Sequence, residues 1–263
     1  MSEWTIDDVI AIARRAGDAI MQIYVQDFAV EAKADDSPLT AADMASHRII
    51  CDGLAALTPE LPILSEESKA IAWDVRRNWQ RYWLVDPLDG TREFVKKNGE
   101  FTVNIAMIED GVPVLGVVLA PALDYLVHGE RGVGACRRDG EHDIELLTRR
   151  PAPTPLRVAA SRSHLDARTA AALEKMGSSE RIGMGSSLKF CRIAEGGIDV
   201  YPRFGPTSEW DTAAAQCVLE AAGGVVLRLD GQPLAYNGKD SLLNPDFIAL
   251  GDADLPWRSW IDG

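Results

Sequence analysis

Two aspartates three residues apart, followed by a glycine turn, form the chemically most informative segment of this chain, Asp86-Pro87-Leu88-Asp89-Gly90-Thr91. Hard divalent cations prefer oxygen ligands, and Mg²⁺ is commonly held by a few carboxylates together with a substrate phosphate. Gly90 lets the backbone bend, so that amides and the Thr91 hydroxyl can face the same space. The segment therefore indicates a magnesium-dependent phosphoryl site, although an ordinary Asp-Pro and Asp-Gly turn explains it equally well when it is taken alone.

Three further carboxylates stand at the ends of expected elements: Asp43, Glu66 and Asp211. Each has a structural alternative. Asp43 can complete a capping box with Thr40, Glu66 can belong to a solvated loop pair, and Asp211 can sit in a first helical turn, where the helix dipole favours negative charge. Side chains from converging loops and element ends are typical of functional sites, and the five carboxylates together favour such a site.

The elements that position these residues follow from the apolar periodicity. In the first half the pattern predicts a helix over 6–23 capped by Thr5, a strand end and turn over 33–38, and a helix from Thr40 to Leu57. Short strands are expected over 62–64 and 82–85, and Pro87 is expected to stop further pairing of the second one. A mostly antiparallel region follows, with strands over 101–108, 112–119, 125–127 and 132–136.

The second half alternates strands and helices, which is typical of α/β units. The strands are expected over 156–160, 181–184, 198–201 and 225–229, and the helices over 167–176, 187–194 and 212–222. The segment 149–155, with three prolines, is the best linker candidate. We therefore expect a subdomain over 1–150 with the antiparallel sheet and most of the carboxylates, and an α/β subdomain over 151–263 that contributes Asp211.

Composition narrows the class of protein. The chain has 263 residues, 46% of them hydrophobic and 25% charged, which indicates a globular protein. A net charge of -13 and a pI near 4.8 repel polyanions, which argues against a nucleic acid polymer as partner, whereas a metal can reverse the field inside one cleft. No signal peptide or membrane-spanning run is recognised, so the chain is expected in the cytoplasm. Four scattered cysteines are expected to be free packing thiols.

Four motifs in order resemble the signatures of the inositol monophosphatase superfamily. They are Asp36-Ser37-Pro38-Leu39-Thr40-Ala41-Ala42-Asp43, Leu64-Ser65-Glu66-Glu67-Ser68, Asp86-Pro87-Leu88-Asp89-Gly90-Thr91 and Glu209-Trp210-Asp211-Thr212-Ala213-Ala214-Ala215. The segments 92–101, 161–164, 185–190 and 199–205 resemble its bacterial CysQ branch, the 3'(2'),5'-bisphosphate nucleotidases. The resemblance extends over nearly the whole chain.

This resemblance implies a layered α/β/α/β/α sandwich and a lithium-sensitive, magnesium-dependent phosphatase. Its substrate would be adenosine 3',5'-bisphosphate, with the 5'-phosphosulfate relative as a further candidate, and its role would lie in sulfur metabolism. Several Mg²⁺ ions would be held by Glu66, Asp86, the Leu88 carbonyl, Asp89 and Asp211. Asp43 and Thr91, with Glu66, would act on the attacking water. Inositol or fructose 1,6-bisphosphate phosphatase activity is the alternative, and a non-catalytic metal or nucleotide sensor is a further one.

A second phosphate requires a second anion site. The sequence Gly185-Ser186-Ser187 is expected to open a helix whose amides bind anions, with Lys189 and His164 adding charge. A serine N-cap beside a surface lysine is an equally good explanation. Arg203 can contact phosphate, stack on adenine or form an interdomain ion pair. The substrate-binding set expected from the sequence is Gly90, Thr91, His164, Ser186, Ser187, Lys189, Arg203 and Asp211. Both a monomer and a homodimer are compatible with the sequence, as is peripheral association with the cytoplasmic side of the inner membrane.

Overall fold

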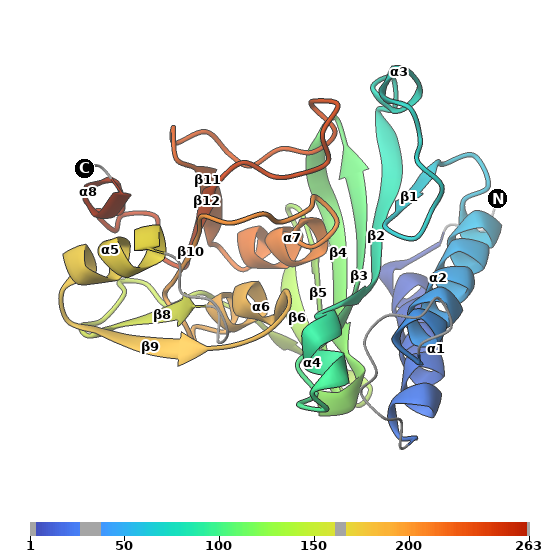
Figure 1. Cartoon of the computed structure of the whole chain (residues 1–263), viewed down its shortest axis with the longest axis horizontal. Helices are drawn as coiled ribbons and strands as arrows, with labels where there is room; N and C mark the ends of the chain where they lie inside the picture. The colour runs from blue at the N-terminus through green and yellow to red at the C-terminus, as the bar shows by residue number, and fades with distance from the viewer. Residues whose placement is uncertain (1–3, 27–37, 161–166, 262–263) are drawn as a thin grey trace.

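The computed structural model describes residues 4–26, 38–160 and 167–261, and these form alternating layers of helices and sheets. In order across Figure 1 the layers are a helix pair, a large sheet, a second helix pair, a smaller sheet and an outer helix pair. The expected α/β/α/β/α sandwich is confirmed. Three buried clusters fill the spaces between the layers, so each sheet is covered on both faces.

The first layer contains α1 (Ile6–Tyr24) and α2 (Pro38–Leu57). Thr5 is the N-cap residue of α1 as expected, and its backbone amide donates to the carboxylate of Asp8 at 2.8 Å. The expected start of α2 at Thr40 is wrong, because the helix begins at Pro38. Proline suits a first helical turn, where its missing N–H is not required. Thr40 is therefore inside the helix and is not the N-cap of a box with Asp43.

The large sheet has the strand order β1-β2-β3-β4-β5-β6-β7 in the described part of the chain. Its first pair is parallel and every other pair is antiparallel. Side chains of β2 alternate between the two covered faces: Trp83 packs toward α1 and α2, and Tyr82 and Leu84 pack on the opposite side. The strands are β1 (Ile63–Ser65), β2 (Arg81–Asp89), β3 (Thr102–Glu109), β4 (Val112–Ala120), β5 (Tyr125–Glu130), β6 (Gly134–Asp139) and β7 (His142–Glu145).

The prediction that Pro87 ends the pairing of β2 is wrong. Asp86 pairs with Asn104 and Asp89 pairs with Thr102, so β2 has one residue more than β3 over this stretch. Such a bulge leaves a position without a ladder bond, and proline can occupy it because no N–H is needed there. The strand continues through the bulge and carries both aspartates.

The middle layer contains α6 (Leu188–Ala194) and α7 (Ala213–Ala221). The helix α7 lies very close to the sheet because glycines face it. A Cβ atom on Gly116 would lie 2.2 Å from the Ala214 carbonyl oxygen, and one on Gly129 would lie 2.8 Å from Val218 Cα. This close approach brings the start of α7, and with it Asp211, against the strands that carry the other carboxylates.

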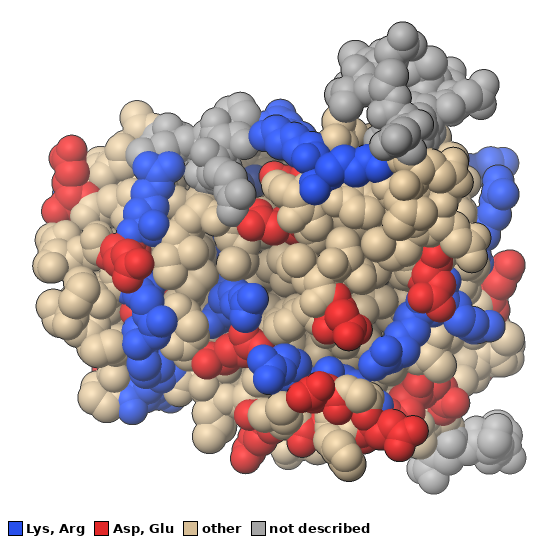
Figure 2. All heavy atoms as spheres, turned by 90° about the horizontal axis from the view of Figure 1, so that it is seen from below, with Lys and Arg blue, Asp and Glu red and all other residues tan. Residues whose placement is uncertain are grey.

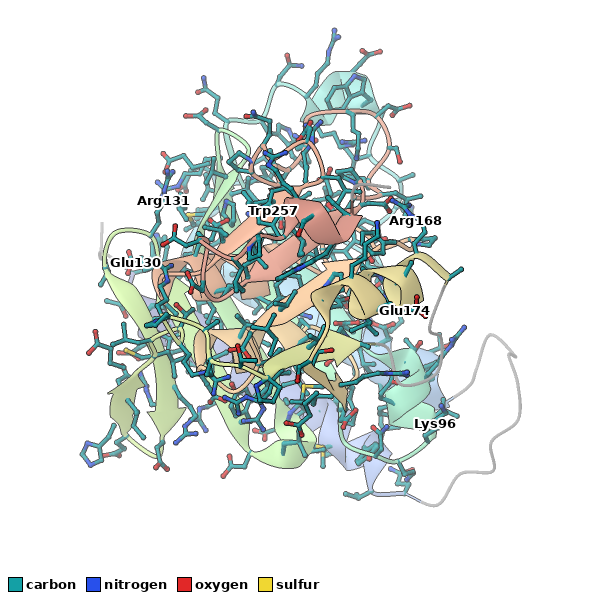
Figure 3. All side chains as sticks on the ribbon, turned by 90° about the vertical axis from the view of Figure 1, so that its left-hand side faces the viewer. Lys96, Glu130, Arg131, Arg168, Glu174 and Trp257 are labelled. Atoms are coloured by element: carbon teal, nitrogen blue, oxygen red, sulfur yellow. The ribbon has the colours of Figure 1, made fainter. Side chains whose placement is uncertain are left out.

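The smaller sheet has the order β11-β12-β10-β8-β9, with β8 parallel to β9 and β10 and with β12 antiparallel to β10 and β11. Trp257, labelled in Figure 3, belongs to the buried cluster on the outer face of this sheet. The elements are β8 (Leu156–Ala160), α5 (Ala167–Met176), β9 (Ser179–Gly183), β10 (Val200–Arg203), β11 (Val225–Arg228), β12 (Phe247–Leu250) and α8 (Arg258–Ile261).

The sequence pattern missed β7, β12, α8, the short helices α3 (Trp73–Arg76) and α4 (Thr91–Val95), and the 3₁₀ turn η1 (Pro121–Leu123). Of the strand end and turn expected over 33–38, residues 33–37 lie outside the described residues, and Pro38 belongs to α2. Residues 146–155 connect the two sheets without a helix or strand, which suits the expected linker; the subdomain boundaries remain a prediction.

Other sequence expectations concern thiols, membranes and surface charge. All four cysteines are free; Cys191 and Cys217 are buried, whereas Cys51 and Cys136 are half-buried. Of the described helices, none has the length and apolarity needed to span a membrane. On the face shown in Figure 2, acidic side chains lie among the basic ones.

The packing of α7 gives a stability prediction. The substitution Gly116→Ala should lower the free energy of unfolding by about 3 kcal/mol, because its methyl group would overlap the α7 backbone. The control is Gly238→Ala, whose new Cβ would meet no heavy atom within 4 Å, and which should change stability by less than about 0.5 kcal/mol. Urea denaturation of both variants measures the difference, and equal stabilities would contradict the close packing.

Candidate active site

Three carboxylates from distant parts of the chain meet at one place. Ligand oxygens of Glu66, Asp86 and Asp211 all lie within 4.8 Å of one another. Glu66 directly follows β1, Asp86 is on β2, and Asp211 lies just before α7. Parallel pairing of β1 with β2 brings the first two side by side, and the close approach of α7 adds the third. The sequence expectation that these three converge agrees with the geometry.

The bulge of β2 is held by hydrogen bonds from both sides. The Leu88 amide donates to Asp86 Oδ1 at 3.0 Å, which turns that carboxylate along its own loop. The Ser46 hydroxyl of α2 is fully buried and donates to the Pro87 carbonyl at 2.8 Å. Asp86 Oδ2 is buried and has no hydrogen-bond partner among the described residues. The chain therefore leaves one oxygen of a buried carboxylate available for a ligand.

Asp89 is the last residue of β2, after the bulge, and Gly90 begins the turn into α4. The Ser187 amide donates to Asp89 Oδ2 at 2.6 Å, a short charge-assisted bond from the start of α6. Gly90 is the N-cap of α4 with a φ of 91°, a left-handed conformation that glycine adopts without strain. A Cβ there would also lie 3.0 Å from the Glu100 carbonyl oxygen. Both the conformation and the space require glycine at this turn.

The carboxylates raise one another's pKa values. Burial, followed by the charges of Asp89 and Asp211, raises the pKa of Asp86 well above its usual range. Burial and the charge of Asp211 raise the pKa of Asp89 to about 7, although Lys189 acts in the opposite direction. Burial also raises the pKa of Glu66 to about 7 and that of Asp211 to about 6. Without a counterion these groups favour protonation, so the site is built to hold positive charge.

The donor set fits hard divalent cations. All the converging side-chain ligands are carboxylate oxygens, a buried oxygen of Asp86 has no partner, and the geometry gathers several negative charges in one space. Oxygen ligands of this kind suit Mg²⁺, Mn²⁺ or Ca²⁺ better than the softer metals that prefer thiolates and imidazoles. The residues present therefore fit the metal that the sequence predicted.

Asp43 is on α2 and Thr91 begins α4, and these two helices are neighbours; of the two residues, Asp43 is close enough to act on the pKa of Asp86. Asp43 is 8% exposed, and its Oδ1 has no hydrogen-bond partner among the described residues. Burial, followed by the charges of Glu67 and Glu66, raises its pKa to about 8. Thr91 is exposed as the first residue of α4, directly after Gly90. Without a counterion, Asp43 therefore favours its protonated form near neutral pH.

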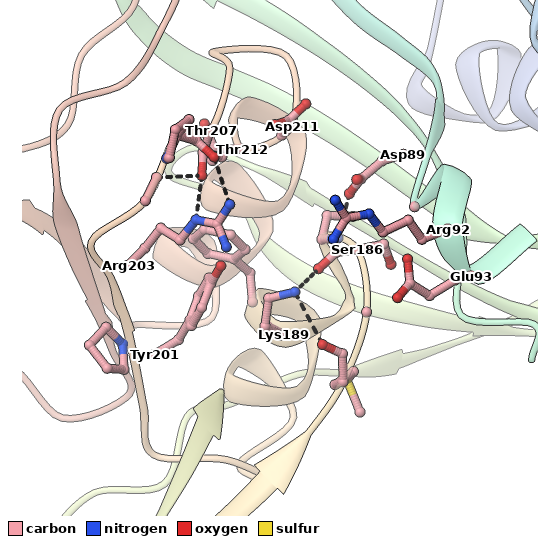
Figure 4. Close-up of a pocket in the computed structure, with 18 of the residues that line it drawn as sticks. Asp89, Arg92, Glu93, Ser186, Lys189, Tyr201, Arg203, Thr207, Asp211 and Thr212 are labelled. Carbon is pink, nitrogen blue, oxygen red and sulfur yellow. Dashed lines mark hydrogen bonds between the residues drawn. The ribbon is translucent and has the colours of Figure 1, made fainter. Parts of the chain in front are cut away.

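A pocket of about 450 Å³ opens beside the carboxylates (Figure 4). Its charged lining residues are the carboxylates Asp89, Asp211 and Glu93 and the cations Lys189, Arg203 and Arg92. In Figure 4 the side chains of Arg203 and Arg92 extend from opposite sides. The cavity thus combines carboxylates that can bind metal ions with three cations, Lys189, Arg203 and Arg92, which we call the positive wall. This arrangement suits a ligand that carries more than one phosphate.

The cations of the pocket are oriented by the chain itself. Lys189 is 7% exposed, and its ammonium group donates to the Ser186 carbonyl at 2.6 Å. The alternative of a surface lysine is therefore wrong, because α6 is covered by the second sheet. Burial lowers the pKa of Lys189 to about 8, with Asp89 opposing this effect. Arg203 donates to the Thr207 hydroxyl at 2.5 Å and to the Pro206 carbonyl at 2.7 Å, which fixes its guanidinium at the pocket wall.

The remaining residues of the site are the other expected substrate-binding residues and the supporting residues that were not predicted. Ser186 and Ser187 line the pocket, whereas His164 lies outside the described residues. Sequence reasoning missed the polar side chains that support the site, namely Ser46, Thr102 and Asn104. A signal existed for two of them, because Thr102 and Asn104 interrupt an otherwise apolar strand.

A second group of potential metal ligands lies on β5, β6 and β7, away from the pocket. Ligand atoms of His128, Cys136 and Asp143 are within 4.8 Å of one another. Asp143, however, accepts hydrogen bonds from Arg138 at 2.6 and 3.2 Å, and Arg138 also contacts Asp7 of α1 at 2.7 Å. These hydrogen bonds from Arg138 hold the pKa of Asp143 at about 2. This group is an ion-pair network that joins α1 to the sheet.

Comparison with known proteins supports the same assignment of fold and identifies the family. The 3'(2'),5'-bisphosphate nucleotidase CysQ of Escherichia coli strain K12 is 51% identical over 245 residues, which cover 92% of this chain and 98% of that protein. The crystal structure of CysQ from Bacteroides thetaiotaomicron has a TM-score of 0.81 and 41% identity, covering 92% of this chain and 95% of that one.

A structural neighbour outside the CysQ group has the same architecture. An inositol monophosphatase from Zymomonas mobilis has a TM-score of 0.80 and 25% identity, covering 98% of this chain and 97% of that one. The sequence profile of the inositol monophosphatase family matches residues 2–253. The chain therefore belongs to the inositol monophosphatase family.

Proposed function

We propose that this protein is a magnesium-dependent 3'(2'),5'-bisphosphate nucleotidase that hydrolyses the 3'-phosphate of adenosine 3',5'-bisphosphate. The observation that carries the proposal is the joining of a carboxylate cluster to a cation-lined pocket, in a chain 51% identical to CysQ proteins over most of its length. The 5'-phosphosulfate relative of this nucleotide, which carries the same 3'-phosphate and a larger 5'-group, is the second proposed substrate. Both substrates belong to sulfur metabolism.

The proposed ligands of the cations are Glu66, Asp86, the Leu88 carbonyl, Asp89 and Asp211. When bound, divalent cations lower the pKa of water, neutralise phosphoryl oxygens and stabilise the leaving alkoxide. The bulge of β2 sets the spacing of its two aspartates, and the Ser187 amide fixes one oxygen of Asp89. The chain itself therefore supplies a preorganised set of negative ligands at the scissile end of the pocket.

Asp43, Glu66 and Thr91 are the proposed groups that act on the attacking water. Asp43 Oδ1 is a buried acceptor without a partner among the described residues, which suits it to accept a hydrogen bond from the attacking water. Thr91 carries its hydroxyl at the start of α4, directly after the left-handed Gly90 and two residues after Asp89. The amides of Gly90 and Thr91 can receive the scissile phosphate at this turn.

The positive wall is proposed to recognise the second phosphate. Lys189 and Arg203 line the pocket, and each donates to a backbone carbonyl that fixes its position. Fixed cations bind a phosphate with less loss of side-chain freedom than mobile surface cations. A substrate with a single phosphate, such as inositol 1-phosphate, would leave this wall without its ligand.

A substrate panel tests the function directly. With Mg²⁺ present, phosphate release from adenosine 3',5'-bisphosphate should exceed release from inositol 1-phosphate or fructose 1,6-bisphosphate by about 100-fold in kcat/KM, because inositol 1-phosphate lacks a second phosphate and the sugar bisphosphate lacks the adenosine that sets the spacing of the two phosphates. Activity should be lost in chelator and reduced by lithium. A preference for inositol 1-phosphate or the sugar bisphosphate would overturn the proposed specificity.

Removal of a proposed metal ligand should abolish turnover without unfolding the chain. The substitution Asp211→Asn is expected to lower kcat/KM by about 100-fold or more at saturating Mg²⁺. The control Asp74→Asn changes a highly exposed aspartate on α3 and should keep full activity. Circular dichroism should show native secondary structure in both variants, and an active Asp211→Asn enzyme would contradict its role as a metal ligand.

The raised carboxyl pKa values predict how the metal-free protein responds to pH. Carboxyl groups with folded-state pKa values of about 6 to 8 take up protons on folding, because the same groups titrate near pH 4 in the unfolded chain. In chelator, the Tm should therefore fall as the pH rises from 5 to 8. Mg²⁺ should raise the Tm most at pH 8, where the ligands are ionised.

Scanning calorimetry with and without Mg²⁺ across this pH range measures the effect. The matched variant Asp86→Asn lacks one of the crowded charges, so its metal-free protein should lose less stability at pH 8 and should respond weakly to Mg²⁺. A metal-free Tm that stays constant or rises with pH, with an equal Mg²⁺ effect at both ends, would contradict the repulsion among these groups.

A further inference from the structure

Ser187 lines the pocket, but its polar atoms are directed toward other residues of the chain. Its amide donates to Asp89 Oδ2 at 2.6 Å, and its hydroxyl donates to Asn104 Oδ1 at 2.7 Å. The Thr102 hydroxyl lies 2.9 Å from the same Ser187 oxygen, and the Asn104 amide group donates to Thr102 at 3.2 Å. The three side chains thus form a closed hydrogen-bonded triangle from which one amide reaches Asp89.

From this geometry we infer that Thr102, Asn104 and Ser187 form a positioning triad that fixes Asp89 for metal binding. The inference rests on the proposed function, because it assigns support to a carboxylate of that site. It also assigns the Ser187 hydroxyl to the triad and not to the substrate, which differs from the expectation drawn from the sequence.

Burial makes the triad rigid. The side chains of Thr102, Asn104 and Ser187 are at most 2% exposed, so water does not compete for their hydrogen bonds. Polar groups buried in this way favour one arrangement, since any other leaves a donor or acceptor without a partner. The Ser187 amide is consequently held at a fixed place relative to β3.

The register of the sheet explains why these residues are the ones involved. Across the β2–β3 ladder, Asp86 pairs with Asn104 and Asp89 pairs with Thr102. The two residues of β3 that face the aspartates are therefore the two that hold Ser187. One set of contacts ties the bulge, β3 and the start of α6 together, and a shift of α6 would change the position of the Asp89 carboxylate.

This arrangement also links the two ends of the pocket. Gly185 and Ser186 directly precede Ser187 and line the cavity, and the Ser186 carbonyl accepts a hydrogen bond from the Lys189 ammonium group. A ligand that contacts this segment acts on the same stretch of chain that orients Asp89. The triad therefore provides a direct physical connection between the cation-lined wall and the metal ligands.

Magnesium affinity, measured without turnover, tests the triad. The variants are Thr102→Val and Ser187→Ala, each of which removes a hydroxyl while the Ser187 amide stays. The control is Thr58→Val, which removes an equally buried hydroxyl directly after the C-terminal end of α2. This hydroxyl donates to the Leu54 carbonyl at 3.1 Å and accepts from the Trp83 indole at 2.8 Å. The Tm of each protein is recorded as a function of Mg²⁺ concentration.

Both triad variants should require about tenfold more Mg²⁺ for half of the full Tm increase, as is usual when a supporting partner of a metal ligand is removed. Thr58→Val should lower the metal-free Tm but shift the Mg²⁺ midpoint less than about twofold. The double variant Thr102→Val/Ser187→Ala should be no worse than Ser187→Ala, because both changes break the same network.

The inference is overturned if the triad variants keep the wild-type Mg²⁺ midpoint or if Thr58→Val shifts it equally. If Thr102→Val does not fold, Ser187→Ala gives the same answer. A parallel activity assay of the wild-type protein separates the two proposals. If the triad variants shift the Mg²⁺ midpoint but the wild-type protein does not hydrolyse the bisphosphate, the triad is supported and the proposed function is overturned. If the wild-type protein hydrolyses the bisphosphate and the triad variants keep the wild-type Mg²⁺ midpoint, the proposed function is supported and the triad is overturned.

Discussion

Repulsion among closely gathered carboxylates is the constraint on which the rest of this structure depends. Glu66, Asp86, Asp89 and Asp211 are gathered into a space where burial and their mutual charge all raise their pKa values. Such a cluster opposes folding unless protons or cations neutralise it. The surrounding layers must therefore supply enough packing to hold the cluster together, and three buried clusters between five layers do so.

Three features of the fold near the site bring these carboxylates together. The bulge of β2 presents two aspartates from one strand, the parallel pair β1 and β2 sets Glu66 beside them, and glycines on the large sheet admit the backbone of α7 with Asp211 just before it. Buried hydroxyl and amide groups complete the support, from Ser46 on one side and from Ser187 on the other. The same start of α6 lines the cavity that holds Lys189, so the negative and positive parts of the pocket share one rigid frame.

Much of this arrangement could be predicted from the sequence, because local patterns and ordered motifs carried it. The helix after Thr5, the strand and helix at 156–160 and 167–176, and the convergence of Glu66, Asp86 and Asp211 all follow from residues close in sequence or from the resemblance. The bulge at Pro87 could not be read locally, since it depends on the register of β3. The strand β12 was missed because Phe247-Ile248-Ala249-Leu250 gains its partners only from β10 and β11, and the triad was missed because Ser187 looks like a simple helix cap.

The central claim is that the carboxylates hold divalent cations at one end of the pocket. Anomalous X-ray scattering from crystals soaked in Mn²⁺ tests it most directly, because this ion occupies oxygen-ligand sites that suit Mg²⁺ and identifies itself by its absorption edge. The account predicts anomalous peaks within about 2.5 Å of oxygens of Glu66, Asp86, Asp89 and Asp211. Peaks confined to other surfaces, or none near these four residues at saturating Mn²⁺, would contradict it.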